Sequence, residues 1–219
     1  MKSAAKTVFL LDVDNTLVDN DALIEDLRQH LIDVVGVECQ QRYWSIFEAC
    51  RRELGYADYL GALQRYREEH PRDPELLRVS LFLLEYPFGE RVYPRALETI
   101  AALRSRGPVV ILSDGDVVFQ PYKVERAGLW AAVDGEVLIY VHKEQMLDDV
   151  ERRYPAEHYV MVDDKRWILA AMKETWGRRL TTVFVRQGHY ARDADLTASQ
   201  PADLAIESIG DLIDLARLW

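Results

Sequence analysis

The sequence predicts an α/β protein with a Rossmann-like core, in which helices cover both faces of a parallel sheet, and an inserted α-helical cap. Short continuous apolar runs at residues 8–11 and 109–112 are typical of strands that are buried on both faces. From residue 94 onward such runs alternate with helical patterns, which implies a parallel sheet with right-handed crossovers. No strand pattern interrupts residues 20–90, so this block is predicted to be an insertion after the first strand.

Within the inserted block, the first helix is expected to be capped by Asn20 and Asp21. Its apolar stripe recurs at helical spacing and ends at Gly36; it consists of Leu23, Leu27, Leu31, Val34 and Val35. Three further amphipathic helices are expected at residues 41–54, 56–69 and 74–84, the first of them stopped by Gly55. We therefore assign 19–90 to the inserted helical cap, and 1–18 with 91–219 to the Rossmann-like core.

The remaining core elements follow in a regular alternation. Pro94 suits the first turn of a helix that runs to Gly107. The later strands are predicted at 109–112, 137–141, 159–162 and 181–185. The helices between them are predicted to reach Ala127-Gly128 and to cover 143–153 and 166–177, and the tail at 209–218 is predicted to be a surface helix that packs on the sheet.

Composition limits the classes of partner. The 219-residue chain is 49% apolar and 29% charged, as is typical of a globular protein, and its formal charge is −10. This charge argues against nucleic acid or an anionic membrane as a partner, although local cations still allow a small anionic substrate. The N-terminal apolar run is too short for a signal-peptide core, and no run approaches the length of a membrane span. Cys39 and Cys50 are predicted to be free thiols, which fits a cytoplasmic location.

Side chains suited to catalysis follow the predicted strands. Asp12 and Asp14 come directly after the first strand, and Ser113 after the second. Lys143 follows the third strand, and the fourth ends in Asp163 and Asp164. The carboxyl ends of parallel strands meet at one edge of a sheet, so these side chains are expected to converge on one pocket.

This set of side chains suits phosphoryl transfer, which needs an aligned nucleophile and positive charge around the phosphoryl oxygens. Asp12 is the expected nucleophile, and Asp14 is the expected acid and base for the leaving oxygen and the water. Ser113 would donate a hydrogen bond to the phosphate, and Lys143 would supply charge. The acidic groups, with Asp163 and Asp164, form the oxygen-rich site that Mg²⁺ prefers.

The ordered motifs Asp-Val-Asp-Asn-Thr-Leu, Ile-Leu-Ser-Asp, an isolated Lys and Met-Val-Asp-Asp resemble those of the haloacid dehalogenase-like hydrolase superfamily. The resemblance implies a helical cap after the first motif, Mg²⁺ dependence and usually phosphatase activity. It also implies a metal held by the Asp12 carboxylate, the Asp14 carbonyl and Asp164. Asp163 would either bind the metal directly or contact one of its ligands. Asn15 stands where the family most often has Gly, which the turn accepts because Asn tolerates unusual dihedral angles.

Several alternatives remain open. A phosphomutase or a haloacid dehalogenase would use the same fold, although dehalogenases of the superfamily generally lack the acid at the position of Asp14. A non-catalytic module that binds phosphorylated ligands is a further alternative. The oligomeric state and the natural substrate stay open.

Some flanking residues carry weaker expectations. Asp114 and Asp116 are expected to shape a turn and cap the next helix, and His142 is expected to be structural. The basic and aromatic residues of the inserted block suggest a solvated face, or one or two arginines that clamp a remote anionic group of the substrate. These residues are Arg42, Tyr43, Trp44, Arg51, Arg52, Arg65 and Arg67.

Overall fold

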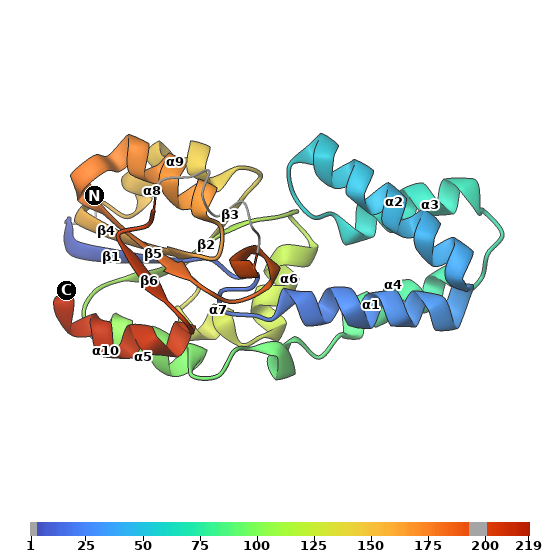
Figure 1. Ribbon diagram of the computed structural model, residues 1–219, viewed down its shortest axis with the longest axis horizontal. Helices are drawn as coiled ribbons and strands as arrows, with labels where there is room; N and C mark the ends of the chain where they lie inside the picture. Colours follow the sequence, from blue (N-terminus) through green and yellow to red (C-terminus); the bar gives the residue numbers. More distant parts are fainter. Residues whose placement is uncertain (1–3, 193–200) are drawn as a thin grey trace.

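A six-stranded parallel sheet forms one half of the molecule, and a group of helices extends from it (Figure 1). The computed structural model describes residues 4–192 and 201–219, so the first three residues of the chain and residues 193–200 of the predicted core lie outside the described part. The strand order is β3-β2-β1-β4-β5-β6. The strands are β1 (Ala5–Leu11), β2 (Val109–Asp114), β3 (Val137–Tyr140), β4 (Ala156–Asp163), β5 (Leu180–Val185) and β6 (Leu204–Ile206).

Strand β1 lies in the middle of the sheet and pairs in parallel with β2 and β4. Its side chains alternate between two apolar layers, as expected for a strand buried on both faces. Phe9 and Leu11 belong to one cluster, and Val8 and Leu10 belong to the other. The central position of β1 places the end of this strand, where Asp12 follows, between the ends of its two neighbours.

Helices cover both faces of the sheet, which confirms the predicted fold class (Figure 1). On one face lie α8 (Leu147–Arg153) and α9 (Arg166–Trp176), and on the other lie α5 (Ala96–Arg104) and α10 (Leu212–Leu215). Two short helices, α6 (Phe119–Arg126) and α7 (Leu129–Ala132), follow β2. Leu138, Met161 and Met172 pack in the cluster on the α8 and α9 side, whereas Phe9 packs edge-on against Trp219 on the other side, 5.7 Å between ring centroids.

The inserted block consists of α1 (Asn20–Val35), α2 (Val37–Leu54), α3 (Tyr59–Glu69) and α4 (Leu76–Glu85). Gly36 and Gly55 end the first two helices with φ of 85° and 84°, as the sequence predicted. The predicted cap of α1 was wrong. Asp19 accepts the hydrogen bond from Ala22, because Asn20 already lies inside the helix. The cap and core boundaries 19–90 and 91–219 stay a prediction.

Other differences from the predicted elements are local. The chain after α4 forms a 3-10 turn, η1 (Phe88–Arg91), where a loop was expected, and Lys143 begins the 3-10 turn η2 (Lys143–Gln145) rather than α8 itself. The tail divides into η6 (Ile209–Asp211), α10 and η7 (Ala216–Leu218) instead of forming one helix. The sequence did not predict β6, whose three residues are too few to show a periodic pattern.

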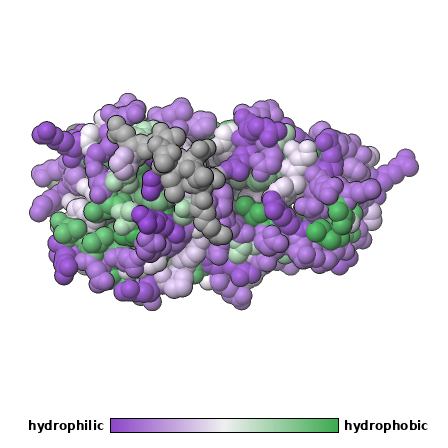
Figure 2. Space-filling view, in the orientation of Figure 1, coloured by the Kyte–Doolittle hydropathy of each residue, from purple (hydrophilic) through white to green (hydrophobic). Residues whose placement is uncertain are grey.

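The surface agrees with the charged composition. The face shown in Figure 2 is mostly hydrophilic, with small separate apolar areas. Within residues 4–192 and 201–219, none of the helices has both the length and the apolar character needed to cross a membrane. Cys39 and Cys50 are free thiols, as predicted; Cys50 is buried and Cys39 is partly buried.

Candidate active site

Three carboxylates from two neighbouring strands meet at the carboxyl edge of the sheet. Asp12 follows β1, Asp163 ends β4, and Asp164 comes next. One carboxylate oxygen from each residue lies within 4.8 Å of the other two, and all three side chains are buried. The parallel pairing of β1 with β4, Leu11 opposite Val162, brings them together. The predicted convergence of these strand ends is therefore observed.

Lys143 lies among these carboxylates and is fully buried. Its Nζ is 2.5 Å from Asp12 Oδ1 and 2.7 Å from Asp163 Oδ2. Burial lowers the pKa of Lys143, but the Asp12 and Asp163 carboxylates outweigh that effect and raise the pKa above its usual range. The lysine is therefore held as an ammonium against two carboxylates.

The Asp12 carboxylate is held from three directions. Besides Lys143, Ser113 Oγ donates to Oδ1 and Thr16 Oγ1 donates to Oδ2, each at 3.4 Å. Gln120 Nε2 in turn donates to Ser113 Oγ at 3.0 Å, which fixes the serine. Burial raises the pKa of Asp12, but the Lys143 ammonium offsets this and leaves the pKa below its usual value. Asp12 is thus an ionised carboxylate in a buried setting.

Asp164 differs from the other acids because neither of its carboxylate oxygens has a hydrogen-bond partner among the described residues, although both are buried. Burial raises the pKa of Asp164 well above its usual range, against the opposing effect of Lys165. Asp163 shares the effect of burial, which raises its pKa to about 6 despite Lys143. Unpartnered buried carboxylate oxygens are costly unless a cation or a proton satisfies them. The residues present therefore fit a divalent cation with oxygen ligands.

Asp14 projects beside this cluster and is held by α6. Lys123 Nζ lies 2.7 Å from Asp14 Oδ1, and Gln120 Nε2 donates to Asp14 Oδ2 at 3.4 Å. Sequence analysis missed both α6 residues. One signal was present: Lys123 falls four residues after Phe119 and four before Ala127, on the buried stripe of a helix, where a solvated lysine would not be expected.

The turn between β1 and α1 is built around Asn15. Its φ of 58° is left-handed, as the sequence predicted for this position. Its Oδ1 accepts hydrogen bonds from the backbone N–H groups of Asn20 and Asp21, at 3.1 and 3.2 Å. Asn15 therefore caps α1 together with Asp19, and it fixes the direction in which the inserted helices leave the sheet.

A cavity of about 600 Å³ opens from the acidic cluster towards the inserted helices. Asp14, Asp164 and Lys165 line its floor, and Trp44 and Arg51 of α2 line its wall. Lys165, which sequence analysis did not assign to the site, faces the carboxylates. Burial lowers its pKa, but Asp12 and Asp164 outweigh this and raise it.

Of the basic residues singled out in the inserted block, Arg51 reaches this cavity and donates a hydrogen bond to the hydroxyl of Tyr190 in the turn η4 (His189–Arg192). Arg42 and Arg65 instead pair with Glu69 and Glu53 on the surface.

The remaining predictions near the pocket had mixed outcomes. Asp116 accepts from the N–H groups of Val118 and Phe119, as a cap of α6 should. Asp114 was expected to shape the same turn, but it accepts instead from the backbone N–H of Lys143, at 2.8 Å. His142 lines a second, 340 Å³ cavity next to Asp14 and Lys165, so it borders the pocket.

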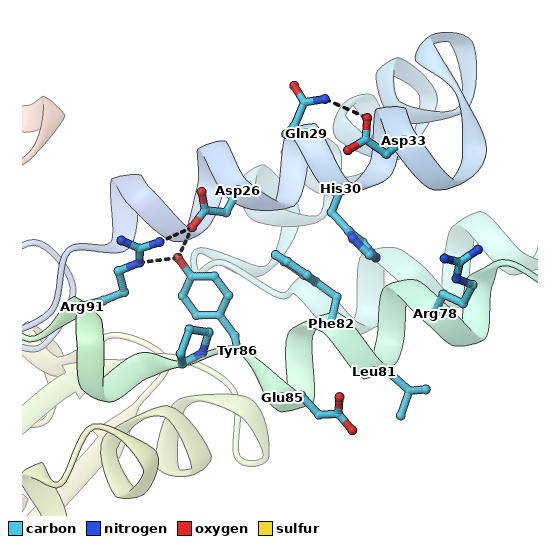
Figure 3. Close-up of a pocket in the computed structure, with 11 residues that line it drawn as sticks. Asp26, Gln29, His30, Asp33, Arg78, Leu81, Phe82, Glu85, Tyr86 and Arg91 are labelled. Atoms are coloured by element: carbon cyan, nitrogen blue, oxygen red, sulfur yellow. Dashed lines mark hydrogen bonds and ion pairs between the residues drawn. The ribbon is translucent and has the colours of Figure 1, made fainter.

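Another hollow lies on the inserted helices, away from the acidic cluster (Figure 3). Tyr86 Oη and Arg91 both donate to Asp26 Oδ2, at 2.6 and 2.7 Å. His30 stacks on Phe82 between α1 and α4, with 4.3 Å between ring centroids. These contacts hold the end of the inserted block against α1, so we assign them a structural role.

Buried carboxylates and lysines at the carboxyl edge of a parallel sheet, beneath a long helical insertion, define an α/β enzyme with an acidic catalytic pocket. The sequence model of the haloacid dehalogenase-like hydrolases matches residues 6–174. The chain belongs to this family and is a hydrolase. None of the curated proteins matches the chain.

Solved structures extend this result. A protein of Burkholderia xenovorans LB400, described as a haloacid dehalogenase-like hydrolase, is 62% identical over 96% of this chain and 98% of its own, with a TM-score of 0.93. The hydrolase YfnB of Bacillus subtilis, bound to magnesium, is 15% identical over 98% and 99%, with a TM-score of 0.65. The L-2-haloacid dehalogenase of Xanthobacter autotrophicus, with chloropropionic acid covalently bound, is 18% identical over 97% and 98%, with a TM-score of 0.64. The last two similarities concern the fold alone.

Proposed function

We propose that this hydrolase is a Mg²⁺-dependent phosphatase that cleaves small organic phosphate monoesters through a phosphorylated Asp12. The observation that carries the proposal is the position of Asp14. It follows the nucleophile by two residues and has its carboxylate held beside the same pocket, so acid and base catalysis is available there. Cleavage of a carbon–halogen bond would not need a general acid here, because a halide leaves without a proton.

In the first step, a carboxylate oxygen of Asp12 attacks phosphorus and the bond from phosphorus to the ester oxygen breaks. Asp14 gives its proton to the leaving alkoxide, which departs as the alcohol. In the second step, Asp14 takes a proton from water, whose oxygen attacks phosphorus and displaces the Asp12 carboxylate. Lys143 and Ser113 lie within reach of Asp12 and would neutralise and orient the phosphoryl oxygens.

The carboxylates of Asp12 and Asp164 would hold the metal ion, with Asp163 beside them. Asp164 is the strongest candidate ligand, because both of its oxygens are buried and have no hydrogen-bond partner within residues 4–192 and 201–219. An oxygen of Asp163, by contrast, already lies against Lys143. When bound, Mg²⁺ supplies positive charge that offsets the carboxylates and the phosphoryl group. A magnesium-bound relative of the same fold, YfnB, supports this choice of ion.

The inserted helices would select the substrate. Trp44 and Arg51 line the cavity above the acidic cluster, and a space of about 600 Å³ suits a metabolite rather than a folded phosphoprotein. Arg51 is the arginine placed to meet a remote anionic group of such a substrate. Helices that cover the pocket would also exclude bulk water from the reaction.

A haloacid dehalogenase is the second candidate, because several solved structures of similar fold are L-2-haloacid dehalogenases. Purified protein with Mg²⁺ should release inorganic phosphate from p-nitrophenyl phosphate and a panel of metabolite phosphates, and no halide from 2-chloropropionate. Transfer of phosphate between positions of a sugar phosphate would indicate a mutase instead. Halide release without phosphate release would sink the proposal.

A further inference from the structure

We infer that Lys123 is a positioning residue for Asp14, and that Asn20 and Tyr59 extend this control to inserted helix α3. The inference rests on the proposed phosphatase function, in which Asp14 moves the protons. The observation behind it is a continuous chain of hydrogen bonds from α3, through α1 and α6, to the Asp14 carboxylate.

The chain begins at Lys123, which is fully buried on α6. Its Nζ donates to Asp14 Oδ1 at 2.7 Å and to Asn20 Oδ1 at 2.9 Å. Asn20, itself buried at the start of α1, then donates from Nδ2 to Tyr59 Oη at 3.2 Å. Each donor and acceptor pair is within hydrogen-bond distance, and Lys123, Asn20 and Tyr59 belong to three different helices.

Tyr59 is the first residue of α3 and is buried among aromatic side chains of both halves of the molecule. Its ring stacks on Phe47 of α2 at 4.8 Å between centroids and lies 5.5 Å from Phe119 of α6. Packing therefore leaves little freedom for the Tyr59 hydroxyl. The Tyr59 hydroxyl therefore restrains the side-chain amide of Asn20, and the Oδ1 of that amide restrains the direction of the Lys123 ammonium.

Stability alone does not explain a lysine at this position. Lys123 is fully buried, whereas the Asp14 side chain is 21% exposed. Desolvating the lysine is costly, and replacing a desolvated ion pair with apolar groups is often neutral or stabilising. An ammonium that holds one oxygen of an acid and base, however, fixes the direction in which its carboxyl group points. Gln120 holds the other oxygen of Asp14, so α6 restrains both. A small misplacement of such a group lowers the rate of the step it serves.

The test uses two esters that differ in how much the leaving oxygen needs a proton: an alkyl phosphate and p-nitrophenyl phosphate. Tyr59→Phe removes one hydroxyl and keeps the ring. We expect it to lower kcat on the alkyl ester about tenfold and on the aryl ester about twofold or less, with KM unchanged. Lys123→Met should lower kcat on the alkyl ester about 100-fold. Asp14→Asn should also lower kcat more on the alkyl ester than on the aryl ester, and by a larger factor than Lys123→Met does.

Tyr66→Phe is the matched control, because Tyr66 is a buried tyrosine of the same helix that stacks on His70, away from Asn20. It should leave both rates unchanged. The double variant of Tyr59→Phe and Lys123→Met should be no slower than Lys123→Met alone, since the two side chains act on Asp14 in series.

Equal loss on both esters in Tyr59→Phe, or effects that multiply in the double variant, would overturn the inference. The Tyr59→Phe result stands even if Lys123→Met does not fold. A parent protein that cleaves neither ester would instead refute the proposed phosphatase function.

Discussion

The ion pairs at the sheet edge are buried, whereas those on the surface of the inserted helices are exposed. At the sheet edge, Lys143 lies between Asp12 and Asp163 with all three side chains at most 2% exposed. On the inserted helices, Arg42 pairs with Glu69 while their side chains are 49% and 41% exposed. Exposed pairs contribute little to stability, whereas buried charges are costly and occur where function needs them. The contrast favours the sheet edge as the candidate catalytic region without reference to any relative.

The same contrast separates the two larger hollows. The cavity above the acidic cluster is lined by Asp14, Asp164 and Lys165. In the hollow between α1 and α4, Tyr86 and Arg91 both donate to Oδ2 of Asp26, whose side chain is 39% exposed (Figure 3). Asp26 is therefore paired and partly solvated, whereas both oxygens of Asp164 are buried with no hydrogen-bond partner among the described residues.

The largest expected effect comes from the nucleophile. Asp12→Asn should lower phosphatase kcat by more than about 10⁴-fold, because the amide cannot form the phosphorylated intermediate. Circular dichroism should show an intact fold. Asp33→Asn, which alters an exposed carboxylate on α1, should keep full activity. Turnover by Asp12→Asn at the parent rate would remove the nucleophile assignment.

Loss of the buried ammonium should affect both activity and stability. Lys143→Met removes the ammonium that lies between Asp12 and Asp163, and removing one partner of a buried pair costs about 3–5 kcal/mol. Urea unfolding without Mg²⁺ should show this loss. Activity should fall with it, because the positive charge against the phosphoryl group is gone. A variant that is as stable as the parent would contradict the view that this lysine balances the cluster.

Magnesium should stabilise the protein more at pH 7.5 than at pH 5. Burial raises the pKa of Asp163 to about 6, above its unfolded value, so its contribution to folding stability is present at low pH and is lost as the pH rises through about 6. Above that pH the Asp163 carboxylate is ionised and favours a cation, and below it protons compete with the cation for the acidic cluster.

Saturating Mg²⁺, at about a hundred times its Kd, should raise Tm by about 5–10 °C at pH 7.5. Asp164→Asn, which removes a buried carboxylate that has no hydrogen-bond partner among the described residues, should remove most of this shift. A shift that is larger at pH 5 than at pH 7.5 would show that the cation does not bind at these acids.

The smallest effect is expected on the inserted helices. Arg42→Ala removes an exposed pair with Glu69 and should change the free energy of unfolding by less than about 1 kcal/mol, with kcat and KM unchanged. Chemical denaturation and steady-state kinetics would measure both. A loss comparable to that of Lys143→Met would break the contrast between exposed and buried pairs.

Much of the fold was predictable because each element carries its own local pattern. The continuous apolar run of β1 and the glycines that end α1 and α2 act over a few residues, so their elements were expected in place. Elements that lack a periodic pattern were not predicted correctly. The three residues of β6 are too short, and the tail breaks into turns where one helix was expected.

The chain by itself also determined which acids meet. Parallel strands bring their carboxyl ends to one edge, so the order of motifs was enough to group Asp12, Asp163 and Lys143. Only the tertiary structure decided which lysines serve the site. Lys123 and Lys165 read as ordinary charged residues, because a lysine's burial depends on what distant elements place around it. The same reason applies to Tyr59 and Asn20, whose contact across 39 positions has no local signature.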